Sequence, residues 1–299
     1  MSFDETMGTV MRLSAGAEAL AALGAKLQAD VDGIELDAAV AEALDDVVAE
    51  LAIDLAALSS QERAIVATAA RAFLLLAGDM LADAERSPGW AIEDPGVLLS
   101  IGRMSAFIAE VIAAVVPTLD GLHEALDREG ASICDVGSGV GALSIAFCRT
   151  WPNARVVGLD PWPPALALAE EEVARSGVAD CIELRQIGVE ELMDEELFDA
   201  VWFAGPFVPP EVVPAGLRRV HAALRPGGWL IFGLFAGPSD PVARAVTKLR
   251  VVRSGGSVAG ADELQRLLTE VGFVDVHEVE RTWQAPAALL AGRRAPGGD

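Results

Sequence analysis

Three glycines at alternate positions follow a short apolar run and form the clearest chemical signature of the chain. The run contains Asp135, and the glycines are Gly137, Gly139 and Gly141. Glycine has no Cβ atom, so such a turn lets a ligand lie directly against the protein backbone. Nineteen residues after Gly141 comes Asp160, whose carboxylate could accept hydrogen bonds from both hydroxyls of a ribose. The pattern predicts a site for a ligand that contains a nucleoside.

The glycine spacing by itself fits more than one nucleoside ligand. Residues 137–142 also match the dinucleotide pattern G-x-G-x-x-A, and Asp160 lies near the distance that pattern requires. Three features argue against a dinucleotide. Asp135 stands two residues before the first glycine, where a carboxylate would face an ammonium group rather than a pyrophosphate. The second feature is a Pro-Gly-Gly turn at 226–228, immediately before the fifth predicted strand. The third is the predicted hairpin at the carboxyl-terminal end, which the standard nicotinamide-binding sheet does not have.

The elements that must position these residues alternate between strand and helix after Gly130. The predicted strands are 131–136, 155–159, 181–187, 198–203, 229–235, 274–281 and 287–293, and helices are predicted after Gly141 and at 163–175, 210–224 and 261–271. Strands separated by helices predict an α/β fold, a Rossmann-like doubly wound sheet that binds ligands at the carboxyl ends of its strands. The short break between the last two strands predicts an antiparallel terminal hairpin, for seven strands in all.

The first 120 residues have helical periodicity only. One helical face is predicted from Val40 to Leu58, a second helix begins at Ser59 or Ser60, and a third runs from Asp94 to Pro117. We therefore expect an all-helical domain over 1–120, which would cap the other domain or form a dimer, and an α/β domain over 121–299. Residues 27–62 hold ten carboxylates without Lys or Arg, which fits a solvated helix face or a docking surface for a basic partner.

The composition limits the partners and the compartment. The chain has 22 Lys and Arg against 45 Asp and Glu, a net charge of −23, which disfavours nucleic acid and anionic membranes as partners. Three cysteines without metal-ligand spacing, Cys134, Cys148 and Cys181, fit a reducing compartment better than a disulfide scaffold or a zinc site. Charges interrupt the apolar runs at 101–116 and 226–239, and Met1–Glu5 is acidic. We expect a cytoplasmic protein with neither a membrane span nor a secretory signal.

Together these motifs resemble the class I S-adenosylmethionine-dependent methyltransferases over about residues 130–293. D-x-G-x-G-x-G at 135–141 is similar to the first motif of the family, and Gly158–Asp160 to the acidic end of its second strand. Similar stretches for its fourth strand, the turn before its fifth strand and its final hairpin are 198–201, 224–229 and 272–276. The helical part resembles, more loosely, the amino-terminal additions of small-molecule methyltransferases, which cover the acceptor site and often form homodimers.

The resemblance implies S-adenosylmethionine as the cofactor and a small-molecule acceptor, and the residue spacing predicts no metal site. Asp135 would pair with the methionine ammonium, Asp160 would hold the ribose, and Trp162 would pack on the adenine. The implied cofactor-binding residues are Asp135, Gly137, Ser138, Gly139, Gly141, Asp160, Pro161, Trp162, Gly188, Val189, Phe203, Ala204 and Gly205. Such enzymes commonly have an acidic residue at the place of Gly188, which receives the adenine amino group. Either Glu190 or a backbone carbonyl would substitute here, or the adenine would be recognised more weakly.

The chain offers few groups that could act as a general base. Methyl transfer from a sulfonium is an in-line displacement, for which alignment alone can supply ~7–11 kcal/mol. There is no tyrosine, and none of the histidines, His123, His221 and His277, stands just after the fourth or fifth predicted strand. Asp240 and Glu211 do stand near these strands, but they also fit helix caps or first-turn charges. We therefore expect catalysis by positioning and assign no catalytic residue.

An apolar set of side chains is expected to surround the acceptor. The apolar candidates come from the covering helices and from the segment after the fourth strand: Trp90, Met104, Phe107 and Phe207. They favour a small, largely apolar or aromatic molecule. Arg103, on the same helix as Met104, would reach the cofactor carboxylate or an acidic substrate group, or else form a surface ion pair. Two alternatives remain, a protein of this fold that only binds or does not methylate, and an NAD-dependent oxidoreductase.

Overall fold

The computed structural model describes residues 2–235, 239–283 and 287–297. Internal contacts group the chain into two compact units. One contains Met1–Glu85 with Leu99–Met104, and the other contains Arg86–Leu98 with Ser105–Asp299. The stretch Arg86–Leu98 therefore groups with the glycine motif, although it lies far before it in the sequence. The expected domain boundary at residue 120 stays a prediction.

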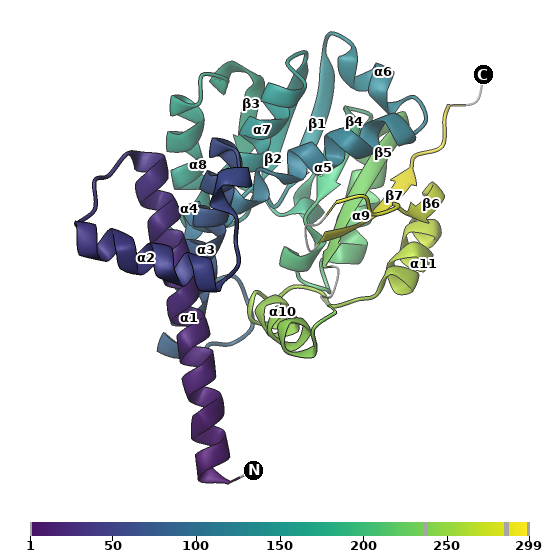
Figure 1. Ribbon diagram of the computed structural model, residues 1–299. Helices are drawn as coiled ribbons and strands as arrows, with labels where there is room; N and C mark the ends of the chain where they lie inside the picture. The colour runs from purple at the N-terminus through teal and green to yellow at the C-terminus, as the bar shows by residue number, and fades with distance from the viewer. Residues whose placement is uncertain (1, 236–238, 284–286, 298–299) are drawn as a thin grey trace. The chain divides into compact units, whose positions relative to one another are not determined.

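The larger unit is built on one seven-stranded sheet with the order β3-β2-β1-β4-β5-β7-β6 (Figure 1). Its strands are β1 (Ala131–Val136), β2 (Ala154–Leu159), β3 (Ile182–Arg185), β4 (Phe198–Phe203), β5 (Leu224–Phe235), β6 (Val274–Glu278) and β7 (Ala287–Arg293). Strands β1 to β5 pair in parallel, and β7 is antiparallel to β5 and β6. The order reverses between β1 and β4, which is where a doubly wound sheet opens a crevice for ligands. The predicted sheet and its antiparallel end are confirmed.

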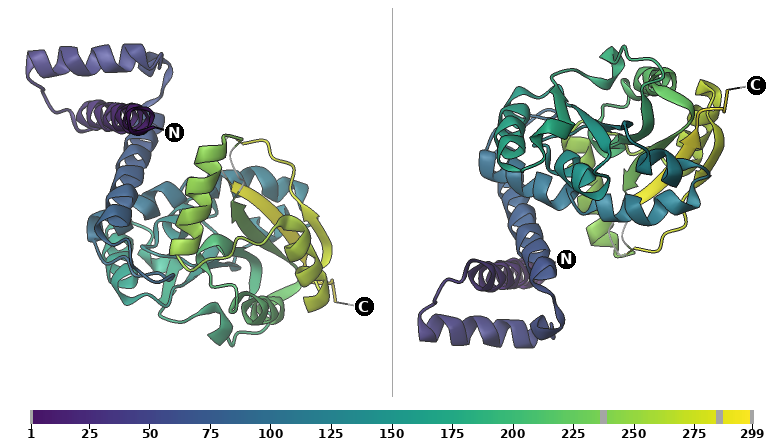
Figure 2. Two further views of the ribbon diagram at one scale, coloured as in Figure 1. Left: turned by 90° about the horizontal axis from the view of Figure 1, so that it is seen from below. Right: turned by 90° about the horizontal axis from the view of Figure 1, so that it is seen from above.

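Helices cover both faces of this sheet (Figures 1 and 2). They are α5 (Ile108–Val115), α6 (Leu122–Asp127), α7 (Ala142–Thr150), α8 (Pro163–Arg175), α9 (Val213–Ala223), α10 (Pro241–Arg253) and α11 (Ala261–Val271), with short 3-10 turns η2 (Val116–Thr118), η3 (Ala179–Cys181), η4 (Val189–Glu191) and η5 (Gly205–Phe207). Side chains of β4 alternate between the two faces. Trp202 packs in the cluster of α5 and α7, whereas Phe203 packs in the cluster of α9 and α11. A central strand buried on both faces explains why 198–203 is apolar apart from Asp199, whose carboxylate pairs with Arg128 and Arg225.

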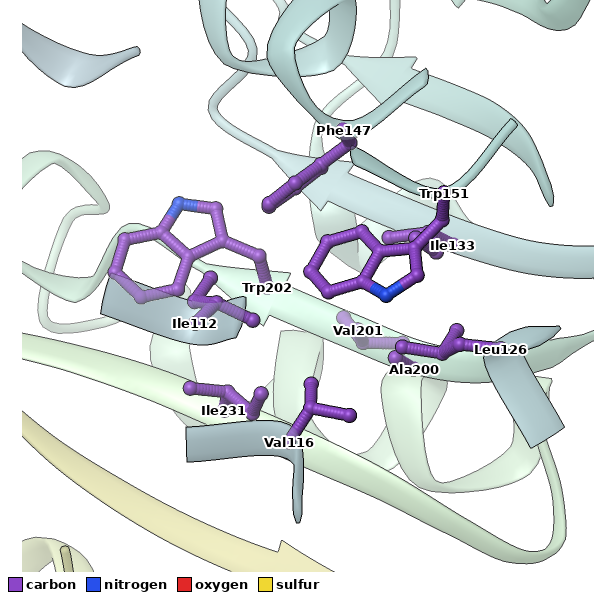
Figure 3. A pocket seen from close by; sticks show the side chains of 10 residues that line it. All are labelled: Ile112, Val116, Leu126, Ile133, Phe147, Trp151, Ala200, Val201, Trp202 and Ile231. Carbon is purple, nitrogen blue, oxygen red and sulfur yellow. The ribbon is translucent and has the colours of Figure 1, made fainter. Parts of the chain in front are cut away.

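The core under α5 and α7 is close-packed. Figure 3 shows a gap in it that is lined by apolar side chains, among them Phe147, Trp151 and Trp202. Its volume is about 10 Å³. A space of that size holds about one water molecule, so it is a packing defect rather than a ligand site.

The helical unit contains α1 (Phe3–Asp32), α2 (Ala38–Glu50), η1 (Leu55–Ala57) and α3 (Ser60–Ala82). Ser59 closes a capping box with Glu62 at the start of α3, as its sequence predicts. The helix expected from Val40 to Leu58 is wrong in extent, because α2 ends at Glu50 and Ala52 has a φ of 53°. The helix expected from Asp94 to Pro117 is likewise two helices, α4 (Pro95–Ser105) and α5.

Two helical stretches of the described residues are long and apolar enough to span a membrane. They are Ser60–Ala82 and Pro95–Thr118, and only the second overlaps an apolar run singled out in the sequence, 101–116. The second includes α5, whose apolar face is buried in the core cluster against the sheet. The absence of a membrane-spanning segment stays a prediction.

The cysteines differ from the expectation. Cys148 on α7 and Cys181 at the end of η3 form a disulfide, and Cys134 is free and buried in β1. The two partners are 33 residues apart, and only the fold brings α7 next to the start of β3. The preference for reduced cysteines over a disulfide is therefore wrong for this pair.

Candidate functional site

The predicted glycine turn follows β1 directly and is held against the end of β2. The backbone N–H groups of Gly137 and Ser138 both donate to the carbonyl oxygen of Leu159, at 2.8 and 3.0 Å. Gly137, Gly139 and Gly141 have φ values of 80°, 55° and 76°, in the left-handed region that favours glycine. The glycines are thus required by the backbone conformation of the turn.

The three glycines differ in what surrounds them. A Cβ atom at Gly137 would lie 3.3 Å from Ala204 at the end of β4, and one at Gly141 would lie 3.3 Å from Val173 on α8. At Gly139 no atom lies within 4 Å of that position. The outer glycines let the turn pack closely, and the central one leaves an open side where a ligand can approach.

Asp135 lies under this turn with its side chain fully buried. Its Oδ2 accepts a hydrogen bond of 2.6 Å from the Ser144 hydroxyl. Among the described residues, its Oδ1 and the buried Ser138 Oγ have no hydrogen-bond partner. Burial raises the pKa of Asp135 to about 7, against the lowering effect of Ser144. Buried polar atoms rarely stay unpaired, so this pair marks the place of a polar or cationic ligand group.

Asp160 directly follows β2 and is held over the glycine turn. One carboxylate oxygen accepts from the Gly139 N–H and the other from the Trp162 N–H, both at 2.8 Å. Burial raises the pKa of Asp160, although these two bonds favour the charged form. Each oxygen has a further lone pair, so the carboxylate can still accept from a ligand diol.

The Trp162 indole is tied to a remote part of the chain. Its Nε1 donates to the carbonyl oxygen of Ile92 at 2.8 Å. The same stretch donates from Gly89 N–H to the Arg253 carbonyl oxygen at 3.0 Å. We call Arg86–Leu98 the covering segment. Through these bonds it contacts the residues after β2 and the end of α10, and through Trp90 it also contacts Phe207 after β4. The contacts of this segment were not predicted from the sequence, because Ser-Pro-Gly at 87–89 indicates only the end of a helix.

The covering segment also brings two predicted acceptor residues together. Trp90 packs edge-on against Phe207 after β4, with ring centroids 5.7 Å apart, and Phe207 is 41% exposed. Phe107 packs instead with the core cluster of α5. Arg103 and Met104 belong to the other compact unit. Their part in an acceptor site stays a prediction.

The predicted adenine side is built around Gly188, at the start of η4. A Cβ atom at Gly188 would lie 2.5 Å from Glu190 Oε2, so the Glu190 carboxylate fills the space of the missing side chain. The Gly188 N–H donates to Glu191 at 2.9 Å, and the buried Val189 packs in the core cluster of α9 and α11. Of the two substitutes expected from the sequence, Glu190 therefore has its carboxylate at this place.

The end of β4 contributes its backbone. The Ala204 N–H donates to the Val136 carbonyl oxygen at 3.2 Å, beside the glycine turn. The fully buried Phe203 ring stacks on Phe232 with centroids 4.8 Å apart, so it serves the core. Gly205 is packed so tightly that a Cβ atom would overlap Phe232. Pro161, after β2, is exposed.

The histidines lie away from this edge of the sheet. His123 is on α6 before β1 and pairs with Asp127 at 3.5 Å, and His221 is in the last turn of α9 before β5. Both therefore stand at the amino ends of strands, whereas the glycine turn is at a carboxyl end. His277 is in β6, at the edge of the sheet. Asp240 caps α10 by accepting from the Ala243 N–H at 2.7 Å, one of the two roles expected for it.

Residues 133–228 match the family model of a methyltransferase domain. The match covers the glycine turn, Asp160 and the β4 end described above. The chain contains a class I S-adenosylmethionine-dependent methyltransferase domain.

Curated relatives of this methyltransferase domain have different acceptors in their names. The chain is 30% identical to a release factor glutamine methyltransferase of Geobacter sulfurreducens over 149 residues, which cover 40% of the chain and 52% of the relative. It is 29% identical to erythromycin 3''-O-methyltransferase of Saccharopolyspora erythraea over 159 residues, or 50% and 52% of the two. The chain thus spans about half the length of these relatives.

A solved structure matches over nearly the whole chain. Human N-acetylserotonin methyltransferase in complex with S-adenosylmethionine superposes with a TM-score of 0.63, covering 98% of this chain and 99% of that one. The sequences are 17% identical, so the likeness is one of fold.

Proposed function

We propose that the protein transfers the methyl group of S-adenosylmethionine to a small, largely apolar or aromatic acceptor. The observation that supports the cofactor best is the pair of unpartnered buried atoms, Asp135 Oδ1 and Ser138 Oγ, under the open Gly139. A dinucleotide would place a pyrophosphate at this turn, next to a buried acidic group. An amino-acid ammonium suits Asp135 far better.

The residues present fit this cofactor. Asp135 would receive the ammonium, and Asp160 would accept hydrogen bonds from the ribose hydroxyls. Glu190 would accept from the adenine amino group, beside the half-buried Trp162 ring. When bound, the cofactor supplies an electrophilic methyl group on a positively charged sulfur.

Methyl transfer would depend chiefly on alignment. No histidine stands at the carboxyl edge of the sheet among the described residues. The Ala204 and Gly205 backbone and the covering segment would hold the two reactants in line and exclude water, an effect that can supply ~7–11 kcal/mol. An acceptor that is already nucleophilic would then need no strong base.

A small acceptor is favoured by the aromatic pair Trp90 and Phe207 and by the relatives. Erythromycin 3''-O-methyltransferase and N-acetylserotonin methyltransferase are both named for small molecules. The release factor methyltransferase is named for a protein, so a protein acceptor is the second candidate. A cytoplasmic location and a homodimer remain our proposals, and light scattering of the purified full chain would check the second.

Calorimetric titrations with S-adenosylmethionine and with NAD would test the cofactor. We expect S-adenosylmethionine to bind and the Asp160→Ala variant to bind it at least about tenfold more weakly, because two charge-assisted hydrogen bonds are lost. Asp180→Ala, an exposed carboxylate before β3, is the matched control. Binding of NAD alone would favour the oxidoreductase, and binding without transfer from labelled cofactor to any acceptor would favour a binding protein.

A further inference from the structure

A second cavity lies beside the cofactor crevice, between β5, α10 and the start of α11. Its volume is about 200 Å³, and it begins at Gly205, the residue after Ala204. Ala204 lies next to Gly137, so the cavity and the glycine turn are both close to the carboxyl end of β4. None of the acceptor residues predicted from the sequence lines this cavity.

The cavity has an apolar floor and a cationic rim. Phe232, Leu234 and Val251 line its inner side, whereas Arg244 and Lys248 line it from α10. Arg244 and Lys248 are exposed and stand four residues apart, on one face of the helix. An apolar floor with charge on one side is suited to an amphipathic molecule.

Helix α10 is unusual in this acidic protein. It contains Arg244, Lys248, Arg250 and Arg253 without any Asp or Glu, although the whole chain has 45 acidic residues against 22 basic ones. Lys248 is one of two lysines in the chain. Positive charge is therefore concentrated on the helix that borders the cavity.

Within the described part of the chain, no carboxylate forms an ion pair with either rim cation, Arg244 or Lys248. The Arg244 guanidinium donates a 3.4 Å hydrogen bond to the Ser239 carbonyl oxygen. Like charges four residues apart on a helix repel each other, so a bound anion would relieve this repulsion. It would also be attracted locally in spite of the overall charge of −23.

We infer that this cavity binds the acidic group and the apolar body of an organic anion, and that the methyl acceptor is such a molecule. The second part rests on the proposed function. A cavity of ~150 Å³ holds one benzene molecule, so about 200 Å³ takes one ring with a small substituent. The carboxylate lies between Arg244 and Lys248, and the ring lies on Phe232 and Leu234.

Two probes of the same size separate charge from shape: benzoate and its neutral amide, benzamide. We expect the full chain to bind benzoate at least about tenfold more tightly than benzamide in NMR titrations, with a preference that weakens in high salt. The double variant Arg244→Gln with Lys248→Gln should lose this preference. Arg219→Gln, an exposed arginine on α9, is the matched control and should keep it.

The anion site is overturned if the full chain does not bind benzoate, if it binds both probes equally, or if the double variant keeps the preference. S-adenosylmethionine binding by the same samples tests the proposed function separately, because no rim residue is among those assigned to the cofactor. Anion binding without cofactor binding would refute methyl transfer and leave the anion site intact. Cofactor binding together with equal binding of benzoate and benzamide would refute the anion site and leave the proposed methyl transfer intact.

Discussion

Asp135 should make the ligand-free protein less stable as the pH rises. Its carboxyl is fully buried, and its pKa is raised from 3.8 to about 7 by burial. The folded chain therefore holds this proton more tightly than the unfolded chain does. The stabilising effect of the neutral carboxyl is fully present below about pH 4 and is lost as the pH rises to about 7. A rise of the pKa from 3.8 to about 7 corresponds to about 4 kcal/mol of stability lost by pH 8.

The variant Asp135→Asn removes this titration while keeping the size and a carbonyl oxygen for the Ser144 hydroxyl. We expect its free energy of unfolding at pH 8 to exceed that of the wild type by up to about 4 kcal/mol, and to be nearly unchanged at pH 4. At pH 8 the variant should bind S-adenosylmethionine more weakly than the wild type does, because an amide does not neutralise an ammonium group. For the wild type, the cofactor affinity should rise with pH up to about 7, with release of a proton on binding.

Urea unfolding between pH 4 and 8.5 without cofactor measures the first effect, and calorimetry in two buffers of different ionisation enthalpy measures the proton release. Asp180→Asn, on an exposed carboxylate, controls for the loss of one charge and should change neither. The reasoning fails if Asp135→Asn is less stable than the wild type at pH 8 or keeps the same pH slope. It also fails if the variant binds the cofactor as tightly as the wild type does.

Three further variants test other parts of the site. Glu190→Gln should weaken cofactor binding about threefold to tenfold with little effect on stability, and Glu195→Gln, an exposed neighbour, should do neither. Trp162→Phe removes the bond to Ile92, worth about 1 kcal/mol, and should speed hydrogen exchange in the covering segment but not in α11. Gly137→Ala places a side chain at a φ of 80° and should cost about 1–2 kcal/mol in urea unfolding; an unchanged midpoint would contradict the strain argument.

The helices and strands that could be predicted from the sequence are those with residues near their ends that interrupt regular structure. The bounds of β1, β4, α8, α11 and β7 agree with the prediction, because glycine, proline or polar residues stand near their ends. The extent of α2 could not be predicted, since the apolar period continues past the break at Ala52. Likewise no Gly or Pro marks the break between α4 and α5, which falls at 106–107.

The glycine turn and Asp160 were predictable because a short stretch of chain determines their geometry. The covering segment was not, because its ties join residues 70 or more positions apart, such as Ile92 to Trp162 and Gly89 to Arg253. The Cys148–Cys181 disulfide and the cavity beside α10 also depend on contacts between distant elements. Sequence periodicity describes each element separately and does not say which distant elements meet.

The covering segment has a kinetic consequence. One continuous stretch of chain touches Trp162 after β2 and Phe207 after β4, so a motion that frees one of them disturbs the other. Entry of the donor and departure of the spent nucleoside would then share a single gate with the acceptor. A burst of product in the first catalytic cycle would indicate that reopening of this segment, rather than methyl transfer, limits turnover.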